Sequence, residues 1–174
     1  VLFSKEENFQ PMTSRLSLYR CIAQKSGCHL VQLGESLTPE YMYGDHYGYR
    51  SGLNASMVTH LAETAEFIKN RINLQRDDYV LDIGSNDGTL LGMFPSDMTN
   101  LYGIDPSAKK FGNFYKTNIN RIETLFSKME LQKYVGDKRF KVITSLSMFY
   151  DLESPLDFMR DVASLLAQDG IWVT

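Results

Sequence analysis

The chain has 174 residues, 43% of them hydrophobic and 22% charged, with a formal net charge of −3. This composition is typical of a globular protein with one buried core, at a length that suits one domain plus a small appendage. The weak acidity and the scattered Lys and Arg argue against nucleic acid or an anionic membrane as the main partner. No apolar run approaches the roughly 20 residues of a membrane span, and the N-terminus lacks a signal-peptide pattern. We therefore expect a cytoplasmic protein without a membrane or nucleic-acid partner. Because residue 1 is Val rather than Met, we also expect a piece of a longer chain.

The first 50 residues lack a sustained hydrophobic period and contain both cysteines. Their one strand-like stretch is "CHLVQLG", residues 28–34, which ends at a glycine. The pattern changes after Ser51, where apolar residues recur at helical spacing and predict an amphipathic helix over residues 53–72. Ser51 or Asn54 could cap this helix. We expect an N-terminal lobe with a tyrosine-rich connector over residues 1–50 and a second domain over residues 51–174.

Short apolar runs and helical patterns alternate along the rest of the chain. The runs over residues 78–84, 100–106, 118–126, 140–147 and 171–174 predict five strands. Helices are predicted between them, over residues 88–94, 106–116, 127–135 and from Ser154 to a terminating Gly170. Strands separated by helices indicate an α/β fold with a parallel sheet covered on both faces.

Polar and glycine residues gather after the predicted strands, where ligands bind in such sheets. Asp82, Gly84 and Gly88 belong to "LDIGSNDGTLL", and Asp105 follows Asp82 by twenty-three residues at the end of the next strand. Glycines let the backbone turn tightly and approach a ligand, and a carboxylate at the second position can accept both hydroxyls of a ribose. The fourth strand is followed by further polar residues, including Tyr150 and Asp151.

The glycine loop departs from the known phosphate-binding motifs. Asn86 stands where a dinucleotide fingerprint has its second glycine, Asp87 would repel a pyrophosphate, and there is no Gly-Lys-Ser/Thr of a P-loop. An acidic loop without Lys suits a cationic or zwitterionic nucleoside. S-adenosylmethionine, which carries a sulfonium, an amino group, a carboxylate and a ribose, fits that description.

"VLDIGSNDGTLL" followed by "LYGIDPS" resembles the cofactor motifs of class I S-adenosylmethionine methyltransferases. With "CHLVQL", "YMYGDHYGYRSGLNASM" and "SMFYDLESPLDF", the chain resembles the zinc-containing sugar C-methyltransferases, which act on nucleotide-linked keto-deoxysugars. The resemblance implies a Rossmann-like sheet, incomplete at the C-terminus, beside a small N-terminal lobe. It also implies that a His/Glu segment proposed to hold the base lies in a C-terminal domain that this chain lacks.

The resemblance implies a role for individual residues. Around the cofactor it places Asp82, Gly84, Ser85, Asn86, Gly88, Asp105, Pro106, Ser107, Thr124, Leu125, Ser145, Leu146 and Ser147. It brings Tyr47 and Tyr49 to the acceptor, and the neighbouring His46 is the histidine most consistent with function. Such hydroxyls and a His can orient the sugar and donate to an enolate oxygen. The family's zinc has four cysteine ligands, but Cys21 and Cys28 match only the second pair, and two ligands do not close a tetrahedral site.

Other interpretations stay open. Gly84 and Gly88 could be ordinary turn glycines, and Asn86 and Asp87 could cap the next helix. Cys21 and Cys28 fit free thiols as well as a partial zinc site for the full-length protein. The chain could also be an O- or N-methyltransferase of another small molecule, or a module that binds S-adenosylmethionine without turnover.

Overall fold

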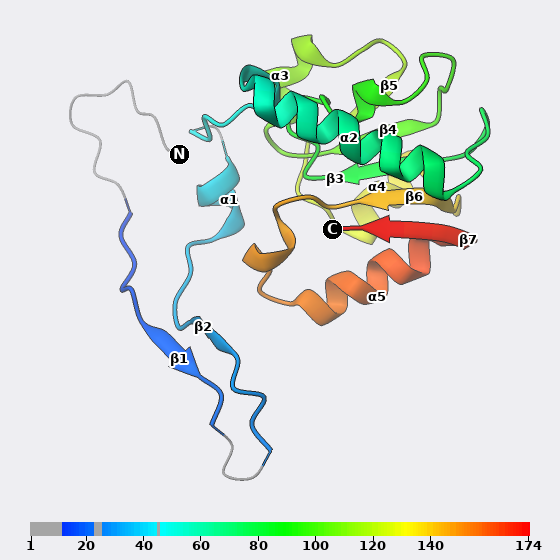
Figure 1. Cartoon of the computed structure of the whole chain (residues 1–174). Helices are drawn as coiled ribbons and strands as arrows, with labels where there is room; N and C mark the ends of the chain where they lie inside the picture. Colours follow the sequence, from blue (N-terminus) through cyan, green and yellow to red (C-terminus); the bar gives the residue numbers. More distant parts are fainter. Residues whose placement is uncertain (1–11, 23–25, 45) are drawn as a thin grey trace. The chain divides into compact units, whose positions relative to one another are not determined.

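The computed structural model describes residues 12–22, 26–44 and 46–174. The chain forms two compact units, Val1–Gly48 and Tyr49–Thr174. Figure 1 shows the elements of each in chain order.

The first unit contains a two-stranded sheet and a short helix. Strand β1 (Leu18–Arg20) pairs antiparallel with β2 (Val31–Leu33), and α1 (Pro39–Tyr43) follows. The strand predicted within residues 28–34 is confirmed as β2, whereas β1 was not predicted. None of the described residues of this unit is buried.

The second unit is built on a five-stranded parallel sheet. Its strands lie in the order β5-β4-β3-β6-β7 and comprise β3 (Val80–Ile83), β4 (Leu101–Ile104), β5 (Ile119–Ile122), β6 (Phe140–Thr144) and β7 (Leu166–Val173). The predicted α/β fold with a Rossmann-like sheet is confirmed. Strand order reverses between β3 and β6, which is where such sheets bind ligands.

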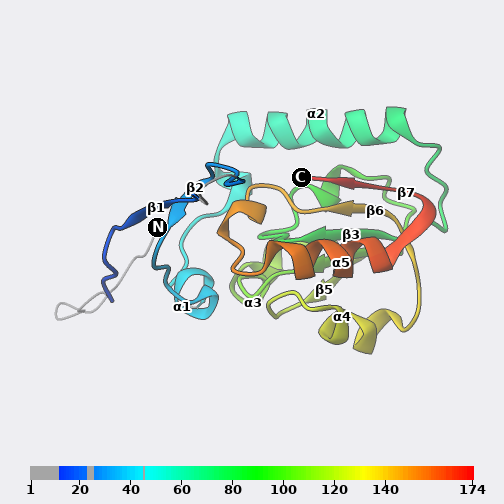
Figure 2. The same cartoon turned by 90° about the horizontal axis from the view of Figure 1, so that it is seen from below.

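Helices cover both faces of this sheet (Figure 2). One face carries α2 (Ala55–Arg71), and the other carries α4 (Lys128–Val135) and α5 (Pro155–Leu165). The remaining helical segments are α3 (Ala108–Phe111) and the 3₁₀ turns η1 (Ser51–Leu53), η2 (Leu91–Met93), η3 (Gly112–Phe114) and η4 (Phe149–Asp151). The helix predicted over residues 53–72 is confirmed as α2, and Asn54 caps it by accepting from the Ser56 N–H.

Two hydrophobic clusters attach these helices to the sheet. Leu61, Ala65 and Ile68 of α2 pack with the strand residues Val80, Leu101 and Val142. On the other face, residues of α4 and α5 pack with Leu81, Ile104 and Ile143. Neighbouring residues of one strand therefore point to opposite clusters, as the twofold period of a strand requires. Burial on both faces explains why the strands are short continuous apolar runs.

The predicted end of α5 at Gly170 is wrong. The helix ends at Leu165, and β7 begins at the next residue. Between the pairs Phe140↔Leu166 and Val142↔Ile171 the register shifts, so β7 bulges. A Cβ on Gly170 would lie 2.7 Å from the Phe140 carbonyl oxygen, so this glycine permits a close backbone approach rather than ending a helix.

Within the described part of the chain, no helix is long and apolar enough to cross a bilayer.

Candidate functional site

The predicted cofactor loop, residues 84–88, follows β3 at the carboxyl end of the sheet. Asp82 pairs in register with Gly103 of β4 on one side and Thr144 of β6 on the other. The turn after β3 therefore lies beside the reversal in strand order.

The loop adopts left-handed backbone conformations at three positions. Gly84 has φ +77°, Asn86 +51° and Gly88 +74°, a region that glycine enters without penalty and Asn tolerates. Gly84 is exposed, and a Cβ there would meet only the Met148 side chain, at 3.4 Å. Its backbone is open to a ligand.

Gly88 is required for a different reason. A Cβ at this position would lie 2.9 Å from the ring of Tyr115. The Tyr115 hydroxyl lies 2.8 Å from Ser85 Oγ and donates to the Asn86 carbonyl oxygen at 3.0 Å. Burial raises the pKa of this phenol, so it stays a hydrogen-bond donor. Sequence analysis did not identify Tyr115, because an aromatic residue in "NFY" is equally typical of a core.

Asp105 lies at the end of β4 and faces the loop. Its Oδ2 accepts from the Asn86 N–H at 2.9 Å, and its Oδ1 accepts from the Ser107 N–H and hydroxyl, both at 2.6 Å. The carboxyl is buried among these donors. Because a carboxylate has about four acceptor positions, Oδ2 keeps capacity for a further hydroxyl.

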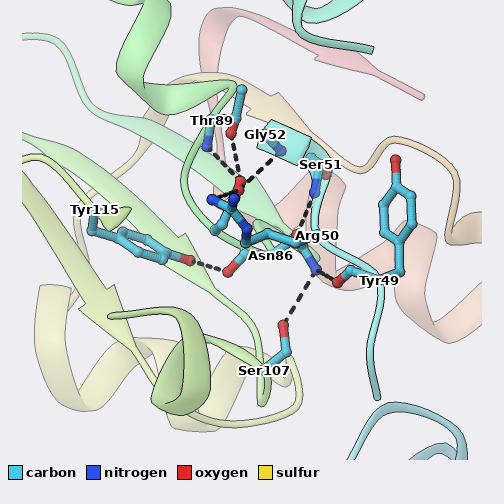
Figure 3. Close-up of polar contacts among 9 residues, drawn as sticks. Tyr49, Arg50, Ser51, Gly52, Asn86, Thr89, Ser107 and Tyr115 are labelled. Carbon is cyan, nitrogen blue, oxygen red and sulfur yellow. Dashed lines mark hydrogen bonds and ion pairs between the residues drawn. The ribbon is translucent and has the colours of Figure 1, made fainter. Parts of the chain in front are cut away.

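Asn86 connects several segments at once (Figure 3). Its side-chain amide accepts from the Ser51 N–H at 2.9 Å and donates to the Tyr49 carbonyl oxygen at 3.0 Å. The amide nitrogen also lies 3.5 Å from Ser107 Oγ. The side chain of Asn86 therefore makes its hydrogen bonds within the protein, to residues 49–51 and Ser107.

The residues 49–53, called here segment 49–53, are bound to the loop a second time through Asp87. Its Oδ2 accepts from the Gly52 N–H at 2.9 Å and lies 3.5 Å from Arg50 Nη1. Its Oδ1 accepts from the Thr89 N–H and hydroxyl at 3.2 and 2.5 Å. Asp87 is thus the cap of the following turn and an anchor for segment 49–53, a pairing that no local sequence pattern predicts.

Asp82 is buried between two strands and accepts from Thr144 Oγ1 at 2.6 Å. Burial raises the pKa of its carboxyl from 3.8 to about 7; the Thr144 hydrogen bond opposes this shift, and the charge of Asp105 adds to it. The carboxyl is therefore partly protonated near neutral pH.

The other predicted cofactor residues differ in exposure. Pro106, Thr124, Leu125 and Leu146 are half-buried, and Ser147 is exposed with φ +56°. Ser145 is fully buried and accepts from Trp172 Nε1 at 2.8 Å. Their contact with a cofactor stays a prediction.

The predicted acceptor residues fall in both units. His46 and Tyr47 belong to the first, where His46 is exposed and the ring of Tyr47 lies 5.4 Å edge-on from that of Tyr43. Tyr49 opens the second unit and is 37% exposed. Their roles in catalysis stay predictions.

The residues that the structure describes form no zinc site. Cys21 follows β1, Cys28 precedes β2, and both are exposed. Nowhere in the described residues do three or more His, Cys, Asp or Glu gather as a metal would need. The two cysteines remain a predicted pair of ligands for the full-length protein only.

Comparison with known proteins assigns most of the chain to a family. The profile of the methyltransferase domain family matches residues 50–174. The C-methyltransferase NovU of Streptomyces niveus is 24% identical over 147 residues, which cover 83% of this chain and 34% of the relative.

Two solved structures share the fold. The CcbJ methyltransferase from Streptomyces caelestis is 19% identical with a TM-score of 0.51, covering 65% of this chain and 47% of that one. The YcgJ protein from Bacillus subtilis is 22% identical with a TM-score of 0.50, covering 66% and 50%. The chain thus spans about a third of the curated relative and about half of each solved structure. Through the match over residues 50–174, the chain belongs to the methyltransferase domain family.

Proposed function

We propose that the chain is the cofactor-binding part of an S-adenosylmethionine-dependent methyltransferase. The observation that carries the proposal is the open left-handed backbone of Gly84 directly after β3, at the strand ends where the buried carboxyl groups of Asp82 and Asp105 lie. A ribose and a positively charged methionine end suit this arrangement, whereas a phosphate would meet carboxylates. Membership of the methyltransferase domain family supports the same conclusion.

The residues present fit this cofactor. Asp105 would accept from the ribose hydroxyls, using the remaining capacity of Oδ2 and that released when the Ser107 hydroxyl turns away. The backbone at Gly84 and Ser85 would lie along the methionine end. Pro106, Ser107, Thr124 and Leu125 would border the adenine, and residues 145–147 would line the opposite side. When bound, the cofactor supplies an electrophilic methyl group.

For the acceptor, we propose a carbon of a nucleotide-linked keto-deoxysugar. The similarity to the C-methyltransferase NovU supports carbon as the acceptor atom. Methylation beside a ketone needs a stabilised enolate, and Tyr47, Tyr49 and His46 would orient the sugar and donate to the enolate oxygen.

Calorimetric titration with S-adenosylhomocysteine tests the cofactor site. The wild-type chain should bind, and Asp105→Asn should weaken binding about 10- to 100-fold, the range expected when hydrogen bonds to a charged group are lost. Asp97→Asn, at an exposed carboxyl, is the matched control and should leave affinity unchanged. Thermal melting shows whether each variant is folded. Absence of heat from the wild-type chain would overturn the proposed function, and unchanged affinity in Asp105→Asn would remove the ribose role.

Limited proteolysis with candidate acceptors tests the sugar assignment. With S-adenosylhomocysteine present, sugar nucleotides should slow cleavage, and non-sugar methyl acceptors should not. Protection by a non-sugar acceptor alone would point to O- or N-methylation instead.

A further inference from the structure

Arg50 is a positively charged residue at the cofactor loop to which sequence analysis gave no role. It lies in segment 49–53, whose backbone is bound to the Asn86 amide on both sides of Arg50 (Figure 3). Its guanidinium carbon lies 3.8 Å from the centre of the Phe114 ring, and its side chain is only 17% exposed. The guanidinium is therefore held in place by a cation–π contact before any ligand arrives.

Most of the hydrogen-bonding capacity of Arg50 is unused. A guanidinium has five N–H donors, and the described residues offer it one acceptor, Asp87 Oδ2, at 3.5 Å from Nη1. That distance is beyond the usual 2.7–3.2 Å of an N–H···O bond. Throughout the described part of the chain, fully buried side-chain nitrogens all have partners. The other Arg50 donors must therefore reach solvent, where a ligand can meet them.

The charges around the loop indicate which group of the ligand Arg50 would bind. Asp82, Asp87 and Asp105 are buried at or beside it, and Arg50 is paired to one of them. Carboxylates suit a sulfonium and an ammonium, but they repel the carboxylate that S-adenosylmethionine also carries. A cation accepts that group favourably, and a planar guanidinium can do so through two parallel N–H···O bonds.

We propose that Arg50 binds the α-carboxylate of S-adenosylmethionine and so selects cofactors that carry an intact amino acid. This inference rests on the proposed function. Nη1 remains toward Asp87, and the unused donors Nη2 and Nε face the ligand carboxylate. The rival role is structural, with Arg50 only attaching segment 49–53 to Asp87 and Phe114.

Calorimetry with a pair of ligands separates the two roles. S-adenosylmethionine and decarboxylated S-adenosylmethionine differ only in the carboxylate. The wild-type chain should bind the intact cofactor about 10- to 100-fold more tightly. Arg50→Gln should remove most of this preference by weakening the intact cofactor alone, and Arg50→Lys, which keeps the charge without the planar fork, should retain part of it. Arg160→Gln, at an exposed arginine, is the matched control and should keep the full preference.

The outcomes distinguish this inference from the proposed function. Equal losses for both ligands in Arg50→Gln would show a structural role and overturn the inference alone. So would equal affinity of the wild-type chain for the two ligands, a result that depends on no variant. If the wild-type chain bound neither ligand, the proposed function would fall, and the inference with it.

Discussion

At the scale of single residues, Asp82 shows what a proposed binding site costs in stability. Its carboxyl lies between two strands with one hydrogen bond, from Thr144, and burial raises its pKa to about 7. An apolar residue would pack here without that penalty. Ionising this carboxyl costs free energy in the ligand-free chain. When a cationic ligand binds, its charge stabilises the carboxylate and makes the ionisation favourable.

The contribution of Asp82 to the stability of the ligand-free chain should therefore fall as pH rises from about 4 to 7. Below the unfolded pKa of 3.8 the carboxyl is protonated in both states; between 3.8 and about 7 only the unfolded state ionises readily, which favours unfolding. The penalty is on the order of 4 kcal/mol at about 1.4 kcal/mol per pKa unit. Chemical denaturation across this range measures it.

Asp82→Asn is the reference for this experiment, since other carboxylates titrate in both proteins and cancel in the difference. The variant should gain free energy of unfolding relative to wild type between pH 4 and 7, with a constant difference above that range. Parallel pH curves for the two proteins would contradict the raised pKa.

At the scale of elements, the predicted cofactor loop is stabilised by hydrogen bonds from distant segments as well as by its own turns. Segment 49–53 precedes α2 and is bound to the loop through Asn86 and Asp87. Tyr115, after η3, holds the loop from another direction through Ser85 and the Asn86 carbonyl oxygen. Two segments distant in sequence thus fix the left-handed backbone that the loop needs.

Asp87→Asn should release segment 49–53 without unfolding the sheet. Both oxygens of Asp87 accept from N–H groups, so an amide in either orientation sets its NH₂ against a donor. We expect a loss of about 1–3 kcal/mol in the free energy of unfolding. Hydrogen exchange should accelerate at Gly52 and Thr89 and stay unchanged in β3. Asp157→Asn, at an exposed carboxyl, is the control; unchanged exchange at Gly52 in Asp87→Asn would refute the anchor.

The elements themselves were largely predictable from the sequence, because their signals are local. Apolar residues at helical spacing predicted α2, and short apolar runs that end at glycine or an acidic residue predicted β3 and β4. The end of α5 was not predictable, because Gly170 lies in β7 at a register shift, close to the backbone of Phe140, rather than at the end of a helix. Strand β1 was missed for a similar reason: its pairing partner β2 lies across a loop.

The site was predictable only in part. Asp82, Gly84 and Asp105 follow from strand ends and a recognisable loop. The contacts of Asn86 and Asp87 with residues 49–52 span 35 to 37 positions, and Tyr115 lies 29 to 30 positions from its partners. Such contacts are set by tertiary packing, and a single sequence carries no signal for them.

At the scale of the whole molecule, the two units differ in what stabilises them. Every buried residue that the structure describes lies in Tyr49–Thr174, including both clusters that pack on the sheet. In the first unit, the apolar side chains of β1 and β2 are more than half exposed, as at Leu18, Tyr19, Val31 and Leu33. A two-stranded sheet without a buried face is marginally stable at best. The second unit should therefore be independent of the first in stability.

The shortened chain 49–174 should accordingly fold alone, with a free energy of unfolding in urea within about 1 kcal/mol of the full chain, because it keeps all the buried apolar surface. The matched comparison is the chain 54–174, which keeps the Asn54 cap of α2 but loses segment 49–53. It leaves the side chains of Asn86 and Asp87 without their backbone partners, and unmatched polar groups cost about 1–3 kcal/mol each. We therefore expect it to be the less stable of the two and to bind S-adenosylhomocysteine more weakly. If 49–174 failed to fold, the second unit would not be independent of the first. If 49–174 and 54–174 were equally stable, residues 49–53 would not stabilise the conformation of the loop.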